Sequence, residues 1–286
     1  MRFSKKMGPV LILPAMLFIL AFLIWPLVYT FYCSFFKLDY LQNGGFVEFK
    51  NYLKIFRDKQ VFDSFRVTFI VTIASTVISM LLGLILALWI ERREGMTAFA
   101  IELVGLLPWV ISMMVGSMLW RWILNGDTSL FNYLIKSLGR EPILLFNNKD
   151  SAVVTLIWVM AWRTIGYSMV MILAGLKSIS TDLIEAARVD GANSWNVLMR
   201  IKIPLIKTPL LISSIVLTMS NFNNNTVPMV LTTGGPCNAT NVITLYLYKL
   251  SFTYYRFGVS SALSTILFVI NAVMIILYIR MVKYDI

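Results

Sequence analysis

The sequence predicts an all-α polytopic membrane protein with six transmembrane helices, and its composition and apolar patterning support this. Hydrophobic residues make up 58% of its 286 residues and charged residues only 14%, whereas a soluble domain carries about 25% charged residues. A transmembrane helix needs about 20 mostly apolar residues. Six stretches qualify, at roughly 8–36, 64–90, 98–124, 151–176, 206–231 and 259–282. The net charge of +11 is scattered between these stretches, so we expect it to set topology and meet anionic membrane lipid, not nucleic acid.

The first stretch follows a basic start that resembles a signal peptide. Its apolar run continues to about Phe36, which is too long for a signal sequence, so we expect a retained span. Internal prolines at Pro14, Pro26 and Pro108 are tolerable where neighbouring helices or water satisfy the freed carbonyls. After this span, Tyr52 and the apolar residues up to Phe65 recur at helical spacing and predict a helix on the membrane surface or capping the bundle.

The third and fourth stretches contain small residues and one charge. Ser112, Gly116 and Ser117 are what close helix packing in a bilayer requires. Arg163 lies several residues inside the fourth apolar run, where an arginine is costly and indicates a functional or water-lined position. The alternative is that Arg163 snorkels to the outer surface or pairs with an acid.

The fifth stretch carries four asparagines within five residues. Asn221, Asn224 and Asn225 fall on one face if the helix continues through them, with Asn223 between. An unsatisfied amide in a membrane is expensive, so these side chains must face protein, water or ligand. Amides both donate and accept hydrogen bonds, which suits sugar hydroxyls. The alternative role is to join helices.

Residues 182–204 form a polar, helix-patterned passage between apolar runs. Asp182 stands three residues before Glu185, the spacing of an N-cap and its capping-box partner. Gly191 can end that helix in a left-handed turn. Residues 192–200 predict a second short helix, and Pro204 is expected to turn the chain. The small residues between the helices leave a shallow face that suits docking into a groove on another protein.

E-A-A, D-G-A and I-x-I-P at this spacing resemble the EAA cytoplasmic loop of permease subunits of bacterial ABC importers, with Ile203 where leucine is usual. The resemblance implies the type I ABC importer permease fold, a single permease domain over 1–286 and a coupling loop at 177–205. It also implies the residues that couple to the ATPase: Glu185, Ala186, Ala187, Asp190, Gly191 and Ala192.

The passage NFNNNTVPMVLTTGGP is similar to the larger permease subunit of maltose-type importers. That resemblance implies a carbohydrate substrate, expected to be an oligosaccharide, that crosses by alternating access. It implies a substrate site with Asn221, Asn224 and Tyr167, and Arg163 beside them. Basic residues directly after a tryptophan, as Arg163 follows Trp162, are common in the family, so Arg163 is only weak support for an anionic substrate. Leu217 and Ser220 replace a serine and a phenylalanine of that subunit, and its extra spans and inserted outer domain are absent.

The chain lacks the residues of an enzyme. It has no G-x-x-x-x-G-K-[ST] phosphate-binding sequence, no Ser/His/Asp or Cys/His set, and no histidine for metal ligation. Cys33 and Cys237 are interpreted as two unrelated thiols. We therefore expect no catalytic site, metal or cofactor in this chain, and ATP with magnesium in a partner ATPase. The expected partners are a second permease, two ATP-binding-cassette subunits and an extracytoplasmic solute-binding protein.

Six spans put both termini on one side of the membrane. Basic density near Arg2, Lys5 and Lys6, in 92–93 and in the coupling loop favours a cytoplasmic location for the termini and that loop, in a bacterial inner membrane. A stand-alone secondary transporter is the main alternative, but no internal repeat supports it. An intramembrane enzyme is disfavoured by the missing catalytic set.

Overall fold

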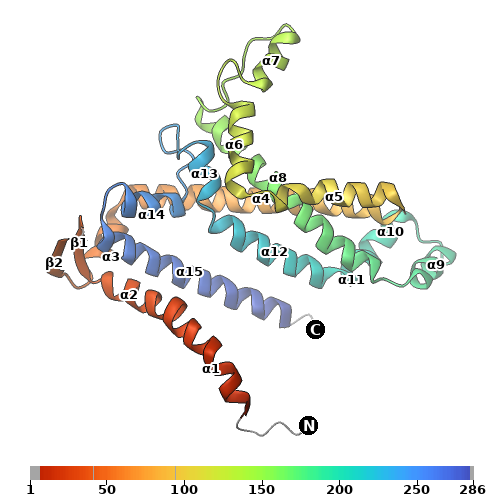
Figure 1. Cartoon of the computed structure of the whole chain (residues 1–286). Helices are drawn as coiled ribbons and strands as arrows, with labels where there is room; N and C mark the ends of the chain where they lie inside the picture. The colour runs from red at the N-terminus through yellow and green to blue at the C-terminus, as the bar shows by residue number, and fades with distance from the viewer. Residues whose placement is uncertain (1–6, 41, 94, 284–286) are drawn as a thin grey trace. The chain divides into compact units, whose positions relative to one another are not determined.

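The computed structural model describes residues 7–40, 42–93 and 95–283, and these are mostly helical (Figure 1). The predicted all-α class is confirmed. Within the described residues, four helices are long and apolar enough to cross a membrane, and two bent helix pairs raise the number to six if each pair is one span. The basic N-terminal residues used to predict topology, Arg2, Lys5 and Lys6, lie outside the described residues.

The chain divides into two units, each described by itself. One comprises residues up to 61 together with 246–273, and the other comprises 62–245 together with the residues from 274. The prediction of a single permease domain over 1–286 stays a prediction.

The first unit begins with a long apolar helix. It consists of α1 (Met7–Ile19), the π-helical turn η1 (Leu20–Ile24) and α2 (Trp25–Cys33). Pro26 lies in the first turn of α2, and the π turn directly before α2 absorbs the change in helical register that the proline imposes. The most apolar window of this helix has no buried residue, as expected for a helix surrounded by lipid or a partner helix.

A β-hairpin that the sequence did not predict follows, and after it comes a short helix in the region where a surface helix was expected. Strands β1 (Phe36–Asp39) and β2 (Gln42–Phe46) pair antiparallel, and α3 (Lys50–Arg57) comes next. The Asn51 amide donates to the carbonyls of Ser34 at 2.8 Å and Phe36 at 2.9 Å, which fixes α3 against the hairpin. The expected surface helix is therefore shorter, because Phe62 and Phe65 belong to α4 (Lys59–Glu91).

The C-terminal helices of the chain are α14 (Ile243–Phe252) and α15 (Phe257–Lys283). Within the first unit, the Tyr246 hydroxyl of α14 donates to the Asp58 carboxylate at 2.6 Å. Burial and this hydrogen bond raise the pKa of Tyr246 above its ordinary value. The phenol therefore stays protonated and remains a donor to Asp58.

The second unit is a helical bundle built around α8. Its elements are α4, α5 (Met96–Val110), α6 (Met113–Leu124), α7 (Leu130–Ser137), α8 (Lys149–Lys177), α9 (Thr181–Val189), α10 (Ser194–Val197), the π-helical η2 (Leu198–Lys202), α11 (Ile203–Leu205), α12 (Lys207–Phe222) and α13 (Thr226–Leu231). Helices α5 and α12 pack along α8, and α13 packs against α6 and α8 (Figure 1). More than half of the apolar window of α8 is buried, so α8 is the axis of the core.

Two of the expected spans are not straight helices. The third is bent by 97° at Ile111 and Ser112, where two extended residues separate α5 from α6. The helix of the expected fifth span, 206–231, ends at Phe222, because the asparagines that follow leave helical geometry before α13 begins. Asparagine side chains compete for backbone hydrogen bonds, and this favours a helix end there.

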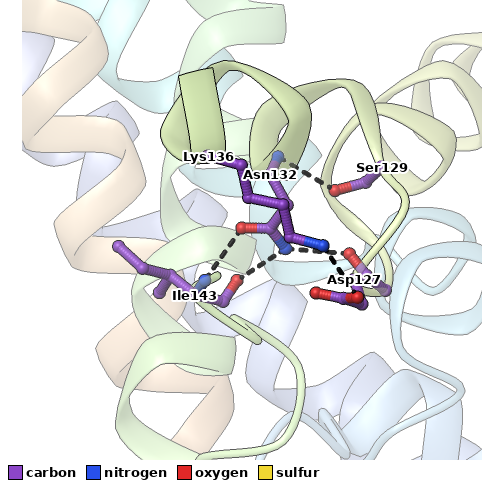
Figure 2. A network of polar contacts seen from close by, with 6 residues as sticks. Asp127, Ser129, Asn132, Lys136 and Ile143 are labelled. Carbon is purple, nitrogen blue, oxygen red and sulfur yellow. Dashed lines mark hydrogen bonds and ion pairs between the residues drawn. The ribbon is translucent and has the colours of Figure 1, made fainter. Parts of the chain in front are cut away.

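Asn132 holds together the loop between α6 and α8. Its amide nitrogen donates to the carbonyls of Gly126 at 2.8 Å and Ile143 at 3.2 Å, and its amide oxygen accepts the Ile143 N–H at 2.8 Å. Its own backbone N–H donates to the Ser129 hydroxyl (Figure 2). Asn132 is completely buried, so one side chain satisfies backbone groups from both ends of the loop.

Asn132→Ala is expected to loosen this loop, because it removes three hydrogen bonds and leaves backbone groups unpaired, at about 1–3 kcal/mol of local stability. Hydrogen–deuterium exchange of peptides covering 126–143 should speed up accordingly. Lys136→Ala is the matched control, because it removes only an exposed ion pair with Asp127, which contributes about 0–1 kcal/mol. Equal acceleration in both variants would contradict the central role of Asn132.

Candidate substrate site and coupling loop

The crossing of α5 and α8 is the tightest backbone approach near the candidate site. A Cβ at Gly166 would collide with the Gly105 carbonyl oxygen, so the two backbones touch as small residues allow in membrane helices. Trp109 lies one turn after Gly105, and Arg163 and Tyr167 flank Gly166 on α8. The crossing therefore brings these three side chains together.

The side chains of Arg163, Trp109 and Tyr167 stack in a row, with Trp109 in the middle. The rings of Trp109 and Tyr167 lie 4.7 Å apart between centroids, at an angle of 31°. The Arg163 guanidinium lies 5.5 Å from the Trp109 ring and donates from Nη1 to the Ile111 carbonyl at 3.1 Å. That carbonyl is free to accept because the α5 helix is interrupted there.

Arg163 does not show the pairing with an acid that was one alternative for a structural charge. Among the described residues no acid forms an ion pair with Arg163. Its Nε is buried and has no hydrogen-bond partner in the described chain. A buried donor of a charged group without a partner is costly, so Arg163 keeps an unused hydrogen-bonding position inside the bundle.

Asn221 and Asn224 are both buried, with 4% and 7% of their surface exposed. The Asn221 amide nitrogen donates to the Thr76 hydroxyl of α4 at 3.1 Å. Asn224 lies one position before the N-cap residue Asn225, and its amide oxygen accepts the Val227 N–H at 3.0 Å and so caps a free N–H in the first turn of α13. Among the described residues, the amide oxygen of Asn221 and the amide nitrogen of Asn224 have no hydrogen-bond partner. Each side-chain amide therefore has one atom bonded within the protein and one atom available for another partner.

The prediction that Asn221, Asn224 and Asn225 share one helical face is wrong, because α12 ends at Phe222. The remaining asparagines have local partners. Asn223 donates to the Met219 carbonyl at 3.0 Å, and Asn225 accepts from the Thr226 hydroxyl. The helix end, and not a helical face, determines where these amides lie.

The predicted substrate residues do not form one continuous cluster: Asn221 is separate from the others. Arg163 and Tyr167 lie together, with Trp109 between them. Val227, which Asn224 caps, lines the same small cavity of about 10 Å³ as Arg163, whereas Asn221 is joined to α4. The sequence reasoning missed Trp109. A tryptophan directly after the mid-span Pro108, far from either membrane interface, is the signal that could have identified it.

The first helix of the coupling loop is α9, and its N-cap is Ser180. The predicted capping box is wrong, because Asp182 lies inside the first turn of α9, where its charge complements the helix dipole. The predicted turn at Gly191 is correct in geometry, with φ of 82°. The Gly191 N–H donates to the Arg188 carbonyl and the Ala192 N–H to the Ala187 carbonyl, which is the Schellman pattern.

The second half of the loop differs from prediction. Its helix begins at Ser194, capped by the Asn193 side chain, which accepts the Asn196 N–H at 2.8 Å. The chain does not turn at Pro204, which lies just after the π-helical turn η2 within a continuous helical segment. The 66° bend comes at Ile206 instead.

The coupling loop is exposed above a fixed base. Helix α9 has no buried residue, and Val189 is 88% exposed. Exposed apolar residues gathered on one element mark an interaction surface. The loop's base is held by an ion pair of 2.5 Å between Lys202 of η2 and Glu91 of α4. Figure 1 places α9 and α10 at the opposite end of α8 from α7.

The predicted coupling residues lie within this loop. Four of them are exposed, namely Glu185, Ala186, Asp190 and Gly191. The other two, Ala187 and Ala192, are half-buried. Among the described residues, no group of His, Cys, Asp and Glu could hold a metal ion.

A bundle with half-paired polar groups between its helices, and an exposed helix pair at one end, is the arrangement of a membrane permease that acts with a partner. Residues 64–283 match the family of the binding-protein-dependent transport system inner membrane component, and the chain belongs to this family. It is the permease subunit of an ABC importer. The type I fold is confirmed, and the secondary-transporter alternative is not supported.

Curated relatives match over nearly the whole chain. The chain is 30% identical to the trehalose/maltose transport system permease protein MalF of Thermococcus litoralis, over 98% of this chain and 95% of that one. It is 33% identical to the osmoprotective compounds uptake permease protein GgtC of Synechocystis, over 94% and 96%. The fold matches a bacterial ABC transporter structure involved in import of the acidic polysaccharide alginate, with a TM-score of 0.86, 20% identity, and 98% and 96% coverage.

Proposed function

We propose that this permease carries a carbohydrate, most simply an oligosaccharide, into the cytoplasm by alternating access. It acts with a second permease, two ATP-binding-cassette subunits and an extracytoplasmic solute-binding protein, in a bacterial inner membrane. Support comes from relatives named for trehalose/maltose and, at 26% identity over 98% of this chain and 91% of the relative, for sulfoquinovosyl glycerol in Agrobacterium fabrum. A related alginate transporter was solved with its pentasaccharide-bound periplasmic protein.

The observation that carries the proposal is the stacked pair of Trp109 and Tyr167 beside Arg163. Aromatic faces accept the apolar face of a pyranose ring, and the tyrosine hydroxyl can meet its polar edge. The unpaired Arg163 Nε supplies a donor beside the rings. The half-used amides of Asn221 and Asn224 supply an acceptor and a donor for hydroxyl groups. Tyr167, Asn221, Asn224 and Arg163 are thus the proposed substrate residues.

The coupling loop gives this chain its link to ATP hydrolysis. Glu185 to Ala192 are proposed to dock in a groove of the ATPase, because α9 is exposed while its base is tied to α4. Closure of the two ATPase subunits would push the loops together and turn the site outward. ATP and magnesium belong to the ATPase in this proposal, since this chain has no phosphate-binding loop sequence.

Reconstitution tests the substrate class. The full complex with its own binding protein, in proteoliposomes containing ATP, should take up labelled trehalose, maltose or an alginate oligosaccharide and should not take up histidine. Histidine is an informative competitor because an amino acid ABC transporter shares the fold with a TM-score of 0.54. Uptake of histidine with no uptake of any of the saccharides would overturn the carbohydrate proposal.

The proposed orientation puts both termini and the coupling loop in the cytoplasm and Cys237 outside. Cys237 is exposed and Cys33 is buried, so a membrane-impermeant maleimide should label one thiol in intact cells stripped of their outer wall. Cys237→Ser should abolish the signal. Labelling of Cys237 only after lysis would reverse the orientation.

A further inference from the structure

A polar pocket lies between the coupling helix α9 and the end of α4, apart from the substrate site, and it shares Glu185 and Arg188 with the proposed docking segment. Its volume is about 390 Å³, and it is lined by the end of α4, one side of α9, and the segment from α10 to η2. Five charged side chains line it, namely Glu91, Arg92, Glu185, Arg188 and Lys202. We call it the headgroup pocket.

The charges in the headgroup pocket favour an anion. Glu91 and Lys202 neutralise each other in their ion pair, with only 14% and 13% of their side chains exposed. Arg92, Arg188 and Glu185 remain, and none of them forms an ion pair with another described residue. Two guanidinium groups against one carboxylate leave one net positive charge. Guanidinium groups bind phosphate oxygens through paired, planar hydrogen bonds.

The depth of the headgroup pocket points to the source of that anion. At the level of the pocket on α4, between the lining residues Leu88 and Glu91, the exposed Trp89 carries the Arg93 guanidinium over its ring at 3.6 Å. Tryptophan and arginine at the end of an apolar span mark the level of lipid headgroups. Leu88 and Ile184 add an apolar edge to the pocket, which suits the glycerol and first acyl carbons of a lipid better than a free ion.

We propose that the headgroup pocket binds the phosphate of an anionic phospholipid of the cytoplasmic leaflet, held by Arg92 of α4 and Arg188 of α9. The inference rests on the proposed orientation of the loop. A phosphate shared by these two side chains would connect the transmembrane bundle to the coupling helix, in addition to the Glu91–Lys202 ion pair. The lipid would then steady α9 at the distance from the membrane where its partner meets it.

The chain provides a matched pair of variants. Arg92→Gln removes a lining charge outside the coupling loop, and Arg93→Gln removes the adjacent charge, which does not line the pocket. General attraction to an anionic membrane should fall equally in both. The assay is mass spectrometry of phosphatidylglycerol retained by the intact complex after transfer from mixed phosphatidylglycerol/phosphatidylcholine nanodiscs into detergent.

We expect retained phosphatidylglycerol in the wild type and in Arg93→Gln, and about tenfold weaker retention in Arg92→Gln and in Arg188→Gln, as for a lost charged hydrogen bond. Equal loss in Arg92→Gln and Arg93→Gln, or no retention by the wild type, would overturn the proposal. Because the readout is binding, a failure here leaves carbohydrate uptake untouched and can be told apart from a failure of the proposed function.

A second arm separates lipid from free phosphate. Millimolar glycerol 3-phosphate should displace little of the bound phosphatidylglycerol, because it lacks the acyl chains that lie along the apolar edge. Complete displacement by glycerol 3-phosphate would assign the pocket to a soluble phosphate and overturn the lipid as its occupant.

Discussion

Gly191→Pro is expected to abolish substrate-stimulated ATP hydrolysis by the reconstituted complex while the permease still inserts in the membrane. Proline holds φ near −65°, whereas Gly191 has φ of 82° and donates its N–H to the Arg188 carbonyl. The substitution therefore breaks the turn that aims α9. Gly191→Ala should cost only about 1–2 kcal/mol of local stability, because alanine can adopt the left-handed conformation at some strain. Its effect on stimulation should be correspondingly smaller.

Gly139, in the loop between α6 and α8, provides a matched control. Gly139 ends α7 with φ of 71° and the same pair of hydrogen bonds, from Gly139 to Lys136 and from Arg140 to Ile135. Gly139→Pro should disturb its own loop to a similar degree and leave co-purification of the ATPase intact. Gly191→Pro should lose that co-purification. If both proline variants keep the ATPase and full stimulation, the loop 177–205 does not couple.

One part of the coupling loop could be predicted from its local sequence and another part could not. The turn at Gly191 could be predicted because its requirement, a residue tolerating positive φ between two helices, is met by neighbouring residues alone. The behaviour of Pro204 could not be predicted in this way. Pro204 lies just after the π turn η2, and this turn takes up the change in helical register that a proline imposes. Lys202, the last residue of that turn, pairs with Glu91, more than a hundred residues earlier.

The substrate site was less predictable, because its contacts are distant in sequence. The six apolar stretches follow from composition, and Arg163 and Tyr167 are one turn apart on any helix. Their neighbour Trp109 is selected by the Gly105–Gly166 crossing, which no local pattern encodes. The pairing of Asn221 with Thr76 spans 145 positions. For this reason the residue types of the site could be predicted and their partners could not.

Asn224→Ser is expected to reduce carbohydrate uptake per assembled complex by roughly 2- to 12-fold, the effect of one lost hydrogen bond of about 0.5–1.5 kcal/mol. Serine can still cap the Val227 N–H, because serine and asparagine are similar N-cap residues. It has no amide nitrogen, which is the unpaired group of Asn224. Asn224→Ala removes both groups and should also destabilise α13 by about 1 kcal/mol.

The two variants separate the ligand role from the packing role. If Asn224 only caps α13, Asn224→Ser should transport like the wild type, and Asn224→Ala alone should lower assembly. If it also binds substrate, both should lose uptake while basal ATP hydrolysis stays unchanged. Proteoliposome uptake, normalised to the amount of complex recovered by gel filtration, measures the difference.

Asn221 is tested through its partner. Thr76→Val keeps the side-chain volume but leaves the buried Asn221 amide nitrogen without its hydroxyl, a loss of about 1–3 kcal/mol. If Asn221 only joins α12 to α4, Thr76→Val and Asn221→Ala should lower assembly alike and leave uptake per complex unchanged. If its amide oxygen also meets substrate, Asn221→Ala should lose uptake per complex and Thr76→Val should largely keep it. Equal assembly loss with normal uptake in both variants would therefore remove Asn221 from the site and leave Asn224, Arg163, Trp109 and Tyr167 to define it.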